Sequence, residues 1–324
     1  MFSLQLRMNL LLIAMFAVIY GIVTMAGTYM GVTNFYFYLI LSFGIMFVQY
    51  LIGPKIIEWT MRVKYIKKEE SPALFAMVEQ QSQLAGIPMP RVCISESAAP
   101  NAFAFGRGVR DGRVCVSRGI MNLLSHEELR AVVGHELAHI KNRDVLTITL
   151  LSVIPMIMYR IAWHFLFYGG GRRGNDRGNN TVLIGIAAML FYFVTNLLVL
   201  YASRIREYYA DKGSVELGNS PSALASALYK LVYGSARLDR ETLREGEGLK
   251  AFFINDPSQA MHEIRDLRQL DLDKSGTIDP MELNTLQNKT VKLKFGDYLM
   301  EAMSTHPNML KRIQHLSSLG RGAA

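Results

Sequence analysis

A long uncharged stretch near the start of the chain constrains its fold more than any other feature. No Asp, Glu, Lys or Arg occurs from Met8 to Pro54. A bilayer core about 30 Å thick is crossed by about 20 helical residues, so this stretch holds two spans, near Met8–Met30 and Phe35–Gly53. A cleaved signal peptide has a much shorter apolar core, of about 7–15 residues. We therefore predict a retained transmembrane hairpin over residues 1–57.

A second pair of apolar segments follows later in the chain. Residues 145–168 contain one charged residue, Arg160, and Thr181–Ser203 contains none. The polar, glycine-rich residues 169–180 separate the two segments and predict a loop. Because an Arg in mid-membrane is costly, Arg160 would extend its side chain to the interface. We predict a second transmembrane hairpin over residues 145–203, and thus four spans in an integral, multi-pass membrane protein.

The basic residues beside these segments predict how the protein lies in the membrane. Cytoplasmic flanks carry an excess of Lys and Arg. The residues that set this orientation are Arg7, Lys55, Arg62, Lys64, Lys67, Lys68, Lys141, Arg143, Arg204 and Arg206. Arg172, Arg173 and Arg177 oppose it. We expect the polar segments to face the cytoplasm, at the plasma membrane if the cell is prokaryotic. The net charge of +8 then matches anionic lipid headgroups and requires no nucleic-acid partner.

The first polar segment, residues 58–144, has the pattern of a small mixed α and β region. We predict a helix over Ser71–Ala85. Short strands are expected at Arg91–Ser95, Asn101–Phe105 and Arg113–Val116. Asp111-Gly112 is a hairpin turn signal between the last two strands. Ser125 followed by Glu128 is a capping box that predicts the start of another helix.

That helix carries the motif His135-Glu136-Leu137-Ala138-His139. Residues four apart lie on one face of a helix, so both imidazoles can bind one Zn²⁺. Glu136 can then hold and deprotonate a metal-bound water, while the metal polarises the scissile carbonyl. The motif also arises by chance, and the alternative is two surface histidines on an amphipathic helix.

A catalytic zinc needs a third protein ligand, and the residues after the fourth span offer one. Glu207 and Asp211 are four apart and share a helix face. Glu207 can bind the zinc, while Asp211 accepts the N–H of a zinc-binding histidine. The alternative is an exposed, charged helix end that includes Arg206 and Lys212. We favour the ligand interpretation because the second hairpin leaves and returns beside the same site.

With these motifs in place, the chain resembles the HtpX-type membrane zinc metalloproteases, which are related to the CaaX-type prenyl endopeptidases. The resemblance rests on His135–His139, Glu207 with Asp211, residues 101–104, and Ser304–Pro307 followed by Arg312-Ile313. It covers most of the chain except roughly residues 258–295. It implies one catalytic zinc and endopeptidase activity on membrane proteins, often misfolded ones, in quality control.

The resemblance also implies the fold and further site residues. The expected fold is an α+β membrane protein, mostly helical, with two transmembrane hairpins and a zincin-like catalytic domain with a small β-sheet. Residues 58–144, 204–257 and 296–324 would form that domain. The strand that pairs with extended substrate would include Asn101, Ala102, Phe103 and Ala104. His306 would steady the oxyanion with support from Arg312, although a plain C-terminal capping role for His306 is an alternative.

Residues 271–282 depart from the family and match a calcium-binding EF-hand loop. The six ligand positions of such a loop are filled by Asp271, Asp273, Ser275, Thr277, Asp279 and Glu282. Gly276 stands at the sharp turn, and Met261–Leu270 and Pro280–Leu286 can form the flanking helices. We predict one Ca²⁺ in an EF-hand-like insert, residues 258–295. An acidic turn between two helices is the alternative.

Three functions are compatible with these features. The first is a zinc endopeptidase at the cytoplasmic membrane face that cleaves membrane proteins or unfolded polypeptides. The second is a prenyl-protein-type endopeptidase with a narrow substrate class, a relative that is usually longer and has more spans. The third is a non-enzymatic, calcium-responsive membrane adaptor with a decayed site. The presence of Glu136 argues against decay.

Overall fold

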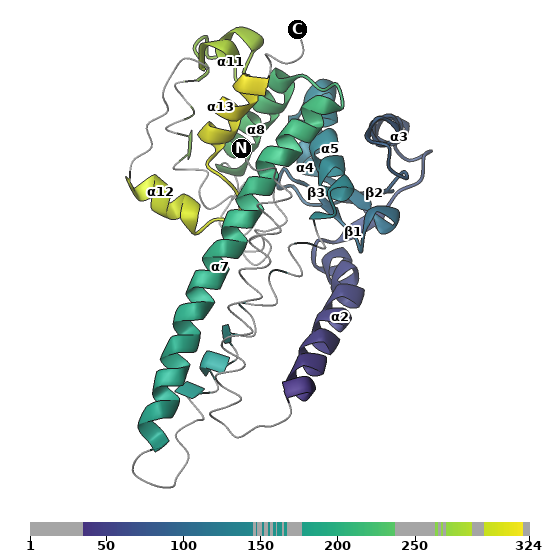
Figure 1. Ribbon diagram of the computed structural model, residues 1–324. Coiled ribbons are helices and arrows are strands. Elements are labelled where there is room, and N and C mark those ends of the chain that lie inside the picture. The colour runs from purple at the N-terminus through teal and green to yellow at the C-terminus, as the bar shows by residue number, and fades with distance from the viewer. Residues whose placement is uncertain are drawn as a thin grey trace. The chain divides into compact units, whose positions relative to one another are not determined.

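The computed structural model describes residues 35–144, 177–236, 270–286 and 295–319, together with single positions within residues 147–166 and 263–267 (Figure 1). Contacts divide the chain into two compact units. One unit comprises residues 1–52 and 146–202. The other comprises residues 53–145 and 203–324. All residues of the candidate site belong to the second unit.

Helix α7, Arg177–Glu216, is the one helix within the described residues that is long and apolar enough to cross a membrane, over Val182–Glu216. Helix α2, Phe35–Thr60, includes the expected second span and exposes large apolar side chains such as Phe47 and Ile52. The first expected span and most of the third lie outside the described residues. The structure therefore supports a membrane helix and does not confirm four spans.

Helix α7 also differs from the sequence prediction at both ends. It begins at Arg177, within the expected loop, and continues past Ser203 to Glu216. No proline interrupts this range, so nothing in the sequence stops the helix where its apolar part ends. Glu207 and Asp211 consequently lie on the same unbroken helix as the apolar segment.

A four-stranded sheet lies beside the site helices, in the order β1-β2-β4-β3. The three predicted strands are present as β2 (Arg91–Ser95), β3 (Ala102–Phe105) and β4 (Arg113–Ser117). Strands β2 and β4 are parallel, with Cys93 opposite Cys115, and β3 pairs antiparallel with β4. Strand β3 is therefore an edge strand of this sheet.

Two details of the sheet differ from the prediction. The β3–β4 hairpin is present, but its connection contains a short 3-10 helix, η1, Val109–Asp111, in place of a two-residue turn. Strand β1, Val63–Tyr65, was not predicted. Its three residues lie among lysines and show too little alternation to indicate a strand.

The helices of the second unit start where the sequence provides start signals. Ser125 and Glu128 form the predicted capping box at the start of α5, His126–Lys141. Proline occupies the first position of three helices, where its missing N–H costs nothing. These helices are α3 (Pro72–Ala85), α8 (Pro221–Ala236) and α11 (Pro280–Leu286). The remaining helices are α4, Arg118–Leu123, α12, Phe295–Ala302, and α13, Met309–Leu319.

Helix α5 is the centre of the packing that positions the site. It packs on α3, α8 and β3, and α13 packs on α8 (Figure 1). Glu128 at the start of α5 also accepts hydrogen bonds from Ser226 and Lys230 of α8, which fixes the two helices against each other. The buried core includes Val133 and Leu137 of α5.

Helices α5 and α7 cross at very short range. A Cβ added at Gly213 of α7 would lie 2.6 Å from Ala138 Cβ of α5, closer than two carbon atoms can approach. Only glycine allows this approach. The crossing brings the face of α7 that carries Glu207 and Asp211 against the face of α5 that carries His135.

A candidate metal centre between helices α5 and α7

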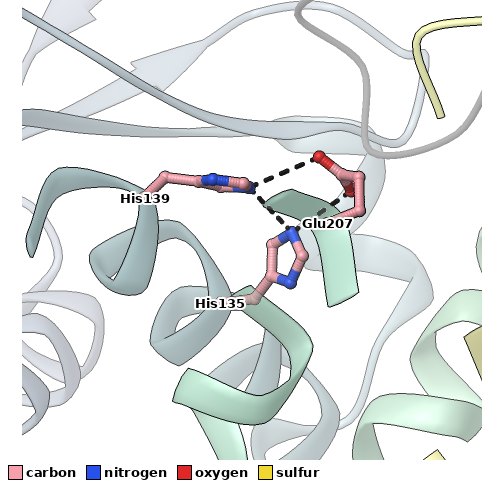
Figure 2. A group of neighbouring side chains, drawn as sticks. All are labelled: His135, His139 and Glu207. Atoms are coloured by element: carbon pink, nitrogen blue, oxygen red, sulfur yellow. Dashed lines mark hydrogen bonds and ion pairs between the residues drawn. The ribbon is translucent and has the colours of Figure 1, made fainter. Parts of the chain in front are cut away.

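The three predicted zinc ligands lie together in the structure. His135 and His139 stand one turn apart on α5, and Glu207 faces them from α7 (Figure 2). One ligand atom of each residue lies within 4.8 Å of the other two. His139 Nε2 is 3.1 Å from His135 Nε2 and 3.5 Å from Glu207 Oε1. His135 Nε2 is 3.6 Å from Glu207 Oε2.

Burial and neighbouring charges set the protonation of the two histidines. Burial, and after it the neighbouring His135, lower the pKa of His139 to about 4. His139 is therefore neutral at neutral pH, as a metal ligand must be. Burial also lowers the pKa of His135, but Asp211 and Glu207 outweigh it and raise the value to about 9. A metal would displace the proton on His135.

The residues around this group fit a divalent metal. Two histidines and a carboxylate are the protein ligands of many catalytic zinc sites, which leave one position open. Both ring nitrogens of His306 are buried and make no hydrogen bond within the described residues, and Nδ1 lies 3.4 Å from Glu207 Oε2. Buried polar atoms without partners are costly. Their position beside the ligands indicates that a bound group completes the site.

Asp211 and Arg312 form a buried pair behind the ligands. Asp211 Oδ1 lies 2.9 Å from His135 Nδ1, as expected for the partner of a metal-binding histidine. Arg312 of α13 donates to both Asp211 oxygens, at 2.9 and 2.6 Å, and its Nη1 is 3.0 Å from Glu207 Oε2. Arg312 thus contacts both the candidate ligand Glu207 and Asp211, the partner of the candidate ligand His135.

Two site residues were missed by sequence reasoning, Asp144 and Arg206. Asp144 Oδ2 lies 2.6 Å from His139 Nδ1, and Asp144 Oδ1 lies 2.9 Å from Arg206 Nη2. The sequence predicts Arg206 to be a basic flank of the second hairpin that faces the cytoplasm, but only 6% of it is exposed. The available signal was the position of an acidic residue five places after His139, at the end of the metal-binding helix.

The other predicted residues are placed as follows. Glu136 is 3% exposed on α5. His306 is held beside Glu207 because Arg204 of α7 donates to the carbonyl oxygens of Glu301, Ala302 and Ser304, just before it. Ala102, Phe103 and Ala104 lie on edge strand β3, and Asn101 immediately precedes it.

The predicted calcium loop forms a second acidic group, in which ligand atoms of Asp271, Asp273 and Glu282 lie within 4.8 Å of one another. Asp271 accepts hydrogen bonds from the N–H groups of Ser275 and Gly276, and Gly276 has the left-handed φ of +80° that suits glycine. Glu282 accepts from Leu272 and Asp279. The loop closes on itself through these bonds, and Thr277 and Asp279 lie within it.

A His-Glu-x-x-His pair on one helix with a glutamate from a second helix defines the class of the protein as a metallopeptidase. The model of Peptidase family M48 matches residues 67–319, and the chain belongs to this family. The matched range also spans residues 258–295, so the family assignment does not by itself set the calcium-loop segment apart.

Individual relatives agree with this assignment. The chain is 50% identical over 246 residues to "Protease HtpX homolog" of Methanothermobacter thermautotrophicus. The aligned region covers 76% of this chain and 92% of the relative. The chain is 35% identical over 275 residues to the protein of the same name from Moorella thermoacetica, covering 84% and 80%. Among solved structures, that of S. mikatae Ste24p matches with a TM-score of 0.47 and 15% identity, over 93% of this chain and 62% of that chain. The two HtpX relatives confirm the expected resemblance to HtpX-type proteases.

Proposed function

We propose that this protein is a zinc-dependent endopeptidase whose zinc is held by His135, His139 and Glu207. The observation that carries the proposal is the convergence of the three ligand atoms within 4.8 Å, from two helices that cross closely. Membership of Peptidase family M48 supports it.

The side chains around the ligands have the chemistry that peptide hydrolysis needs. When bound, zinc would polarise the scissile carbonyl and lower the pKa of water towards neutrality. Glu136, next to His135 on α5, acts as general base that takes the proton from the attacking water and passes it to the leaving amine. His306, whose ring nitrogens make no hydrogen bond within the described residues, donates a hydrogen bond to the developing oxyanion.

Substrate binding would use the edge of β3 opposite β4. Strand β4 occupies one side of β3, and α5 packs beside it. An extended polypeptide can add to the other side through main-chain hydrogen bonds with residues 101–104. Such binding suits membrane proteins and unfolded polypeptides in general, and does not select the narrow class that a prenyl-protein endopeptidase cleaves.

We place the reaction at the cytoplasmic face of the membrane, in protein quality control. Glu207 lies on the same unbroken helix as the apolar segment that starts at Val182, so the site is built on a membrane helix. The basic flanks of the predicted spans favour the cytoplasm. The HtpX relatives are named as proteases.

The test is metal content combined with cleavage of an unfolded membrane protein in detergent. We expect the wild type to bind one zinc, to lose activity with a chelator and to regain it with zinc. His139→Ala should lose both zinc and cleavage, because two ligands do not hold the metal. His126→Ala, an exposed histidine on the same helix, is the matched control and should keep both. Wild-type zinc content in His139→Ala would contradict the proposed ligand set.

We also propose that residues 271–282 bind one Ca²⁺. The convergence of Asp271, Asp273 and Glu282 supports this, as does the EF-hand order of oxygen-bearing residues around Gly276. A calcium-responsive adaptor without enzymatic activity is the second candidate function that this loop favours. The cleavage assay above distinguishes this adaptor from a protease, because the adaptor would not cleave the unfolded membrane protein.

Calorimetric titration of the full-length protein with calcium tests the loop. Glu282→Gln should weaken affinity steeply, because a bidentate glutamate at this position supplies two of the seven oxygens. Glu216→Gln, an exposed glutamate outside the loop that pairs with Lys212, should titrate as the wild type does. If the wild type gives no heat, or if Glu282→Gln gives the same heat, the calcium proposal is wrong.

A further inference from the structure

Each histidine of the candidate metal centre has a carboxylate on its second ring nitrogen. His139 directs Nε2 towards the other two ligands (Figure 2), and its Nδ1 lies 2.6 Å from Asp144 Oδ2. Metal-binding histidines donate their other N–H to a carboxylate or carbonyl, which fixes the tautomer and the orientation of the ring. Asp144 occupies this position for His139, as Asp211 does for His135.

The backbone at the end of α5 makes this contact possible. The helix ends at Lys141, and the N–H of Asn142 still donates to the carbonyl of Ala138 at 2.9 Å. Arg143 then takes a left-handed φ of +57°, which is uncommon for residues other than glycine. Such a conformation persists only where surrounding interactions enforce it. The reversal brings Asp144, 6% exposed, back to His139.

Arg206 of α7 holds Asp144 from the other side. Its Nη2 lies 2.9 Å from Asp144 Oδ1, while Nε and Nη1 are buried without a hydrogen-bond partner within the described residues. A buried guanidinium that makes so few bonds contributes little to stability, because its desolvation offsets the ion pair. A role at the neighbouring metal centre explains the arrangement better than a role in folding.

We propose that Asp144, held by Arg206, is a positioning residue for His139. It accepts the hydrogen bond from Nδ1–H and so keeps the lone pair on Nε2, directed at the metal. The site would then contain two parallel chains of Arg, Asp and His, one through Arg312 and Asp211 and one through Arg206 and Asp144. The inference rests on the proposed zinc function.

Zinc affinity and the spectrum of the cobalt-substituted protein test the proposal, using the full-length protein in detergent. Asp144→Asn should weaken zinc affinity about 10–100-fold, measured by competition with a chelator. It should also shift the visible absorption bands of bound Co²⁺, because the ring of His139 is no longer fixed. Asp144→Glu, which keeps the carboxylate, should recover part of the affinity. Asp111→Asn is the matched control, since Asp111 pairs with buried Arg113 at the sheet, and it should change neither measurement.

Several outcomes would overturn the inference. If Asp144→Asn binds zinc with wild-type affinity and gives a wild-type cobalt spectrum, Asp144 has no positioning role. This holds whatever the effect of the substitution on thermal stability. If Asp144→Asn does not fold, Arg206→Lys is measured instead, because lysine keeps the charge but cannot orient Asp144 as the guanidinium does. A smaller loss of zinc affinity is expected there, and unchanged affinity overturns the inference. A wild-type protein that binds no zinc would contradict the proposed function, so the two failures are distinguishable.

Discussion

Replacing Glu136 by Gln is expected to leave one zinc bound and to lower the rate of cleavage by about 10²–10⁴-fold, the contribution typical of a general base. Glutamine has the shape of glutamate but cannot take a proton from water. Because Glu136 is not among the three converging ligands, metal binding should not change. Zinc analysis and initial cleavage rates on the same preparation measure both quantities.

Glu127→Gln is the matched control for this experiment. Glu127 is an exposed glutamate in the first turn of the same helix, so its replacement should alter neither zinc content nor rate. Cleavage at the wild-type rate by Glu136→Gln would refute the assignment of the base. Loss of zinc in that variant would show that Glu136 supports the metal centre and is not confined to proton transfer.

The second large effect is expected at Arg312. Its side chain is fully buried and contacts Asp211 and Glu207, so Arg312→Met would remove the guanidinium that pairs with both buried carboxylates. Removing one partner of a buried ion pair costs about 3–5 kcal/mol. We expect the free energy of unfolding of the metal-free protein to fall by that amount. Zinc affinity should fall as well, since Asp211 would no longer be fixed against His135.

Denaturant unfolding in mild detergent, with a chelator present, measures this loss. Lys311→Met is the matched control, because Lys311 precedes Arg312 on α13 and forms a partly exposed ion pair with Glu301. A pair of that kind contributes about 0–1 kcal/mol. Equal destabilisation by the two substitutions would mean that Arg312 does not stabilise the carboxylates as described.

The parts of the fold and site that follow from local spacing could be predicted. The capping box at Ser125 and the four-residue spacing of the histidines predict the helix that carries His135 and His139. Glu207 and Asp211 share a face for the same reason, and the structure brings both to the histidines. Their roles as ligand and partner stay predictions, because they require a metal to be tested.

The parts that depend on the path of the backbone could not be predicted. Asp144 reaches His139 only because Arg143 takes a left-handed conformation, and no residue pattern indicates that conformation at an arginine. Arg206 was predicted to be a cytoplasm-facing flank of the second hairpin, because counting basic residues cannot reveal a carboxylate partner that lies far away in the sequence. The short strand β1 was missed because three residues carry too little periodicity to be recognised.

The buried side chains of β3 have a consequence for how this protease would choose its targets. Ala102 and Phe103 are at most 3% exposed, so a polypeptide that adds to the edge of β3 opposite β4 would bind mainly through backbone N–H and C=O groups, once that edge is uncovered. A folded protein has already satisfied such groups internally. A polypeptide can therefore add to β3 only while its own segment is open, and cleavage competes with refolding. The cleavage rate would then report how long a target stays unfolded rather than which residues it contains.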